Sequence, residues 1–176
     1  MCLSGVLNQD NGNVTSFKDG NCSVIFERVD SFVMLVNLEE LNFGNSSSHC
    51  DLLLIRRNRK DRLDVAIFEL KGIQEAISKK SIDELTNHLR AKYYSTLSLL
   101  GTKKLNNSGH NDKTNKLDYS FKDLFKNFKV GTEKYVIVVG GNLWSLFARI
   151  KLQVKTSMGK DCDCEFIKCG EKFHFE

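Results

Sequence analysis

The sequence predicts an α/β fold in which helices flank a central mixed β-sheet, and three patterns indicate it. Two short apolar runs rich in branched residues, Leu52–Ile55 and Leu63–Leu70, enclose a polar run, which is typical of a β-hairpin with a long loop. The continuous branched run Tyr135–Val139 ends in two glycines and is typical of a buried central strand reached by a crossover helix. An apolar stripe with spacings of three and four predicts a long helix packed on the sheet, and its members are Ile82, Leu85, Leu89, Tyr93 and Leu97.

Length, composition and charge describe one ordinary domain. The 176 residues are 41% hydrophobic and 27% charged, as in soluble globular proteins, so we expect a single domain over residues 1–176. The net charge of +4 is compatible with a polyanionic partner. No apolar run has the length of a membrane span, and the N-terminus lacks a basic region followed by an apolar stretch. We therefore expect a cytoplasmic protein with no membrane partner.

The first half of the chain contains further candidate elements. Residues 8–22 are crowded with turn-forming residues, so we expect only brief structure there. Apolar residues then predict a strand near Ser31–Leu38 and allow another near Cys22–Arg28. The striped helix is expected to begin at the capping box Ser81–Glu84 and to stop at Gly101. Its polar residues lie mostly off the stripe, and they include Asn87, His88, Arg90 and Lys92.

The second half is predicted to hold a loop, two helices and a hairpin. Residues 101–117 are polar and predict a flexible loop. An apolar face predicts a helix over Tyr119–Lys129, and Leu143–Ile150 predicts a short one. Residues 151–175 are expected to form a C-terminal β-hairpin that turns near Gly159 and carries a cluster of cysteines.

The register of the first hairpin determines which side chains meet. If the hairpin is symmetric about Lys60, paired residue numbers sum to 120, and Asp51 lies opposite Glu69. Opposed residues share a face, as do residues two apart, so Lys71 joins them. Both faces of the ribbon are otherwise apolar, which indicates a sheet covered on two sides.

Two carboxylates and an ammonium are thus expected at one end of the ribbon. Buried carboxylates repel one another unless positive charge lies between them. Mg²⁺ suits hard oxygen ligands and typically takes one or two protein carboxylates together with phosphate oxygens. A lysine beside such an ion can orient a water and offset charge on a pentacovalent phosphate. These are the parts of a phosphodiester hydrolase.

Asp51 followed by Glu69-x-Lys71 across a hairpin resembles the PD-(D/E)xK nuclease superfamily, and the surrounding residues resemble its small prokaryotic and archaeal members. The resemblance covers Ser48–Gly72. It implies a restriction-endonuclease-like core, a DNA substrate, and Mg²⁺ or Mn²⁺ bound by Asp51, Glu69 and the backbone carbonyl of Leu70. It also implies that Lys71 assists the attacking water. The residue before Asp51 is Cys50, where the superfamily commonly has proline.

The resemblance also suggests residues that complete the site. The superfamily often adds an acidic residue from a helix ahead of the hairpin, and the candidates are Glu27, Glu39 and Glu40. A polar residue from the helix after the motif often approaches the site, and here Gln74 and His88 are candidates. The sequence does not choose among them.

A rival metal site involves the cysteines. The chain has six, and their spacing does not resemble a secreted disulfide framework, so we expect most to be reduced thiols. Cys162, Cys164 and Cys169 have the ligand chemistry of a zinc site. The resemblance to the nuclease superfamily adds a second alternative, because a subset of its members binds an iron–sulfur cluster with one early and three late cysteines, which Cys2 or Cys22 and these three would match. On a strand Cys162 and Cys164 share one face, while Cys169 falls on the other.

Three functions therefore compete. The first is a metal-dependent deoxyribonuclease, active as a monomer or a homodimer. The second is a catalytically inactive nucleic-acid-binding protein of the same fold, whose basic turn contacts phosphates. The third is a small zinc-binding interaction protein that uses Cys162, Cys164 and Cys169. The basic residues of the turn are Arg56, Arg57, Arg59, Lys60 and Arg62.

Overall fold

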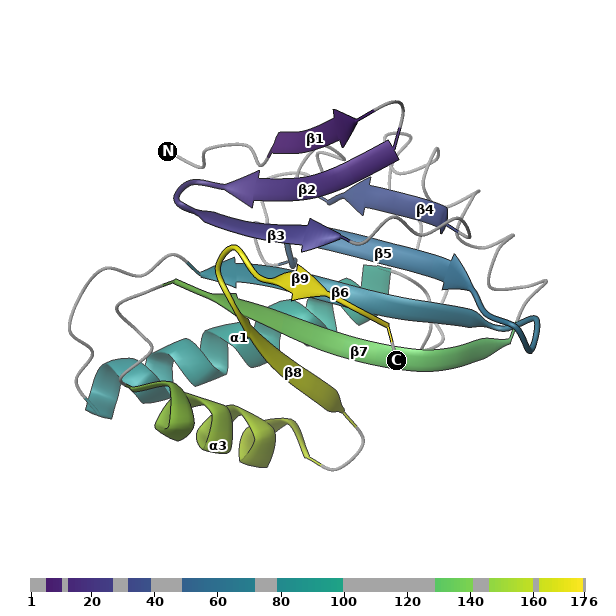
Figure 1. The fold of residues 1–176 in the computed structure, drawn as a ribbon. Helices are drawn as coiled ribbons and strands as arrows, with labels where there is room; N and C mark the ends of the chain where they lie inside the picture. The colour runs from purple at the N-terminus through teal and green to yellow at the C-terminus, as the bar shows by residue number, and fades with distance from the viewer. Residues whose placement is uncertain are drawn as a thin grey trace, which may run out of the picture.

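The chain forms two β-sheets and two helices over the residues that this computed structural model describes (Figure 1). Those residues are 6–10, 13–26, 32–38, 49–71, 79–99, 129–140, 146–159 and 162–175. The elements are β1 (Val6–Asp10), β2 (Asn13–Asp19), β3 (Cys22–Phe26), β4 (Phe32–Asn37), β5 (Leu52–Arg57), β6 (Leu63–Lys71), α1 (Lys79–Leu99), β7 (Val130–Val139), α3 (Phe147–Met158), β8 (Asp163–Lys168) and β9 (Lys172–Phe173).

The larger sheet is mixed and has the strand order β4-β5-β6-β7-β8. The first three strands are antiparallel, and β7 and β8 then add in parallel. Helix α1 lies in the chain between the parallel neighbours β6 and β7, and α3 lies between β7 and β8, since parallel strands need long crossover connections. The predicted α/β class is therefore confirmed.

The β5–β6 hairpin has the predicted register. Leu52 pairs with Phe68 and Arg57 pairs with Leu63, so paired numbers sum to 120. The strands predicted near Ser31–Leu38 and over Tyr135–Val139 are also present, as β4 and β7. The residues that open β5 and close β6 consequently lie at the same end of the sheet.

One face of the larger sheet packs on the two helices (Figure 1). Every second residue of the hairpin faces this side, as Leu53 and Ile67 do. Side chains of a strand alternate between its two faces, so every second residue points to the helices. Each helix packs on the sheet through apolar residues that recur every three or four positions. The helix residues in this cluster are Ile82, Leu89, Tyr93, Leu97, Ile150, Val154 and Met158.

The other face packs on a second sheet with the order β1-β2-β3-β9. Phe68 lies at the centre of this interface and meets the rings of Phe26 and Phe173 edge-on, with centroids 5.6 and 4.9 Å apart. The expectation of brief structure in residues 8–22 was therefore wrong. The turn formers there connect strands: Gly20, with φ of 55°, lies in the turn between β2 and β3. The sheet is covered on two sides as predicted, but in the described residues helices flank only one of them.

Residues 151–175 depart from the predicted hairpin. Residues expected to form a strand after Lys151 belong to α3, and β8 and β9 lie in different sheets. The helical period was overlooked: Ile150, Val154 and Met158 recur every four residues and are all buried.

The remaining predictions concern α1 and its surroundings. Helix α1 starts at Lys79, so the capping box predicted at Ser81–Glu84 lies inside it. The loop predicted at 101–117 and all but the last residue of the helix predicted over Tyr119–Lys129 fall outside the described residues. Among the described helices, none combines the length and apolar character that crossing a membrane requires.

Candidate functional site

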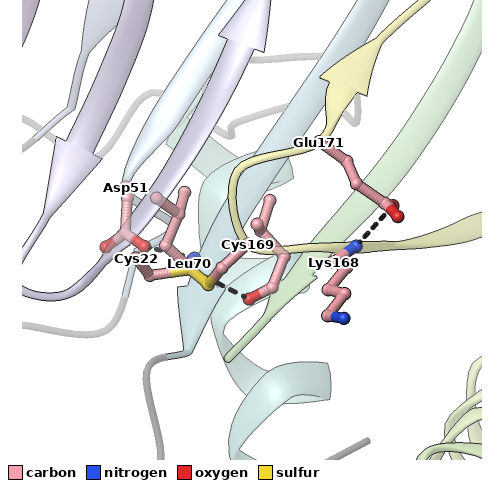
Figure 2. The surroundings of a disulfide bond; sticks show 7 residues. Cys22, Asp51, Leu70, Lys168, Cys169 and Glu171 are labelled. Atoms are coloured by element: carbon pink, nitrogen blue, oxygen red, sulfur yellow. Dashed lines mark hydrogen bonds between the residues drawn. A yellow bond between two sulfur atoms is a disulfide. The ribbon is translucent and has the colours of Figure 1, made fainter. Parts of the chain in front are cut away.

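Asp51 is held between two strands by its backbone and its side chain. Its amide donates to the Phe68 carbonyl and its carbonyl accepts from the Leu38 amide, both at 2.9 Å. Its Oδ2 accepts a hydrogen bond of 2.7 Å from the amide of Leu70 (Figure 2). The side chain thus reaches across to β6, next to Glu69. Its other oxygen, Oδ1, lies on the side of Lys92.

Lys92 of α1 lies between the two carboxylates. Its Nζ is 2.8 Å from Oε1 of Glu69 and 4.0 Å from Oδ1 of Asp51. The side chains of Glu69, Asp51 and Lys92 are 0%, 6% and 12% exposed. Burial lowers the pKa of Lys92, but the carboxylates of Glu69 and Asp51 raise it by more, so the net shift is upward and the ammonium stays charged.

Thr96 fixes α1 against the start of β5. Its hydroxyl accepts from the amide of Cys50 and donates to the carbonyl of Lys92, both at 2.8 Å. Because Thr96 lies one helical turn after Lys92, this contact fixes the height of the ammonium relative to Asp51. It also gives a physical reason for Cys50 in place of proline, which has no amide hydrogen to donate. Burial, together with the nearby Glu69 and Asp51, raises the pKa of the Cys50 thiol, so it remains neutral.

The structure therefore brings Asp51 and Glu69 together, as the register predicted, around a cation that sequence reasoning missed. Lys92 was placed off the apolar stripe of its helix. It directly precedes Tyr93 of that stripe, which indicates a position at the margin of the buried face. The backbone of Lys71 closes β6 opposite Val139 of β7. The position of the Lys71 side chain is outside what the structure describes.

Most of the residues predicted to complete the site fall outside the part of the chain that the structure describes. Glu27, Glu39, Glu40 and Gln74 lie outside the described residues, and His88 is exposed on α1. Within the described ranges, no three His, Cys, Asp or Glu side chains are grouped so as to hold a metal.

The donor set nevertheless fits a hard divalent cation. Two carboxylates converge on one ammonium, which shows that positive charge is stabilised at this point. Mg²⁺ and Mn²⁺ suit one or two carboxylates, with waters and substrate oxygens as the other ligands.

The basic turn lies at the opposite end of the hairpin from Asp51 (Figure 1). The six residues of β5 separate the two ends, or roughly 20 Å at about 3.3 Å per residue. Two of the five predicted phosphate-contacting residues pair with acids: Arg56 Nε is 3.1 Å from Asp64 Oδ2, and Arg57 pairs with Asp61. The other three are exposed, namely Arg59, Lys60 and Arg62.

The predicted three-cysteine metal site is not formed, because Cys169 is joined to Cys22 in a disulfide with a Cα–Cα distance of 5.2 Å (Figure 2). The same disulfide uses the thiols of Cys22 and Cys169 that an iron–sulfur site would need. Most of the cysteines that the structure describes are nevertheless reduced, as expected, and this pair is the exception. Cys50, Cys162 and Cys164 are free. Cys164 packs on the helix side of the sheet and Cys169 on the other, as strand parity predicted. Burial raises the pKa of the Cys164 thiol to about 12, so the thiol is protonated at neutral pH when no metal is bound.

Comparison with known proteins gives no match to any protein-family model, to any curated protein or to any solved structure. The interpretation of the site therefore depends on its own geometry.

Proposed function

We propose that this protein is a metal-dependent nuclease that hydrolyses phosphodiester bonds in DNA and has a restriction-endonuclease-like core. The strand order supports the fold: a three-stranded antiparallel unit, β4-β5-β6, is followed by α1 and the parallel strand β7. In this arrangement the proposed acids lie at the same end of neighbouring strands.

The observation that carries the proposal is the convergence of Asp51 and Glu69 on one buried cation. Two carboxylates that stay together away from water need positive charge between them. Here one ammonium lies beside two carboxylates, one on β6 and one directly before β5, so the three side chains together carry a net negative charge. That stoichiometry suits a site that also accepts a divalent cation.

The proposed roles follow from the chemistry of each group. Asp51, Glu69 and the carbonyl of Leu70 would hold Mg²⁺ or Mn²⁺, which would supply Lewis acidity at the phosphate. Lys92 keeps the carboxylates in place and adds positive charge where a phosphate would develop negative charge. Lys71 would orient the attacking water, as the resemblance implies.

A cleavage assay tests the proposal. Single-stranded, duplex and branched DNA would be incubated with Mn²⁺ and either wild-type protein, Asp51→Asn or the matched control Glu84→Gln, which removes an exposed carboxylate on α1. We expect Asp51→Asn to lower the cleavage rate by at least about 100-fold, the scale of lost electrostatic stabilisation, and Glu84→Gln to cleave normally. Cleavage by Asp51→Asn at the wild-type rate would refute the assignment.

One observation favours the inactive nucleic-acid-binding alternative. Lys92 already offsets part of the charge of Asp51 and Glu69, so the pair is stable without a metal. Salt-sensitive DNA binding, with no cleavage of any substrate in Mg²⁺ or Mn²⁺, would support this alternative.

A further inference from the structure

Exposed cations gather at the end of the β5–β6 hairpin that lies away from Asp51. Arg59, Lys60 and Arg62 are exposed in this turn. The turn extends beyond the sheet beside the start of β7 (Figure 1). The backbone of Lys129 lies beside this turn, because its carbonyl accepts a 2.9 Å hydrogen bond from the amide of Leu63, and Lys129 is also exposed. In the described portion of the chain none of these four cations pairs with a carboxylate.

The turn that presents these cations is fixed by Asn58. Its side-chain Oδ1 accepts hydrogen bonds from the backbone amides of Lys60 and Arg62 at 2.9 and 3.1 Å. The backbone amide of Asn58 donates to the Arg62 carbonyl at 2.8 Å. Asp61 adopts the left-handed conformation, with φ of 59°. Asn and Asp are the residues that tolerate and stabilise such turns.

A buried carboxylate ties this turn to two strands. Asp64 is 3% exposed, and its Oδ1 accepts from Asn58 Nδ2 and from the Thr132 amide at 2.9 and 3.0 Å. Its Oδ2 accepts from Arg56. The backbone passes so close at Gly131 that a Cβ there would lie 2.7 Å from Asp64 Oδ1. The backbone that carries the exposed cations is therefore fixed before any partner arrives, which lowers the entropy cost of binding.

We propose that the turn surface, defined as Arg59, Lys60, Arg62 and Lys129, binds the phosphate backbone of a nucleic acid. Separated cations on a fixed backbone match phosphates that repeat along a strand.

The position of the surface predicts a substrate length, and this part rests on the proposed nuclease function. Roughly 20 Å along β5 corresponds to about six base steps of 3.4 Å. A substrate must therefore extend about six nucleotides to one side of the bond cleaved at Asp51 in order to reach the turn surface.

Binding measurements separate this proposal from the nuclease proposal. Fluorescence anisotropy of a labelled duplex of about 30 base pairs would be measured in EDTA over a range of salt concentrations, with Asp51→Asn present in every variant. The test variant is Arg59→Ala/Lys60→Ala/Arg62→Ala. The control, Lys18→Ala/Arg149→Ala/Lys155→Ala, removes three exposed cations from β2 and α3 and changes the net charge equally.

We expect the test variant to bind at least about tenfold more weakly and its salt slope to fall by about 2.7, at about 0.9 per lost phosphate contact. The control should change affinity by less than about twofold. Asn58→Ala keeps every cation, so it should weaken binding while leaving the slope nearly unchanged.

Equal losses in test and control variants, or no loss in either, would overturn the proposal. If poly-glutamate displaces the duplex at the same concentration of negative charge, the surface binds any polyanion, and the choice of nucleic acid as partner is overturned. If the test variant loses binding and the wild type cleaves no substrate, this proposal is supported and the nuclease proposal is refuted. If cleavage depends on Asp51 and the turn variants bind DNA as well as the control does, the nuclease proposal is supported and the turn-surface proposal is refuted.

Discussion

Lys92 balances the charge of the candidate site at the scale of a single residue. Replacing it with Gln would leave Glu69 and Asp51 buried without their cation. We expect Lys92→Gln to lower the free energy of unfolding in EDTA by about 3 kcal/mol, the usual cost of removing one partner of a buried pair. Chemical denaturation measures this, with the exposed Lys155→Gln as the control that should change little.

The pH dependence of stability follows from the same residue. The folded-state pKa of Lys92 lies above its ordinary value of 10.5, so the folded protein binds this proton more tightly than the unfolded chain. The contribution of Lys92 to stability is complete below pH 10.5 and declines as pH rises through the folded-state pKa. Wild-type stability should therefore fall more steeply than that of Lys92→Gln above pH 10.5. Parallel stability curves in that range would contradict the upward shift.

Helix α1 is positioned by a hydrogen bond that can be removed without changing side-chain shape. Thr96→Val deprives the buried amide of Cys50 of its acceptor, at a cost of about 1–3 kcal/mol. Thr156→Val is the matched control, because Thr156 also donates to the carbonyl four residues earlier but is exposed on α3. Equal unfolding free energies for the two variants would show that the Cys50 contact does not anchor α1.

Elements differed in how far sequence could predict them. The hairpin register agrees with the assumed symmetry about Lys60, but both faces of the ribbon are apolar, so side-chain alternation alone did not determine it. Only the start of helix α3 was predicted, by the helix expected over Leu143–Ile150. The rest was interpreted as an edge strand, because Ile150, Leu152 and Val154 alternate with polar residues. Lys92 could not be assigned to the site, because its reach depends on where α1 lies along the sheet, and Thr96 sets that position through a tertiary contact.

Across the whole molecule, the Cys22–Cys169 disulfide joins the two sheets. It lies beside β6 near Leu70 and Asp51 (Figure 2), and it closes a loop with a sequence separation of 147. Cysteine connectivity cannot be deduced from sequence, and the scattered spacing favoured free thiols. The pairing is nevertheless consistent with strand parity, since both residues lie on the face shared by the two sheets.

Loop closure predicts the effect of removing this disulfide. Constraining the unfolded chain over 147 residues should stabilise the fold by about 2–4 kcal/mol. A thiol reductant should therefore lower the melting temperature of the wild type and leave Cys22→Ala/Cys169→Ala unchanged. A wild-type melting temperature that is the same with and without reductant would contradict the pairing.

The most direct test of the central claim, that Asp51 and Glu69 form one cation-binding pair, is a Mn²⁺ titration by isothermal calorimetry. Wild type, Asp51→Asn, Lys92→Gln and the control Glu84→Gln would be compared without nucleic acid. We expect Asp51→Asn to bind Mn²⁺ at least about tenfold more weakly than wild type, because a ligand is lost. Lys92→Gln should bind it more tightly, because a competing cation is removed. Equal affinities across all four proteins, or no binding by wild type and Lys92→Gln, would contradict the claim.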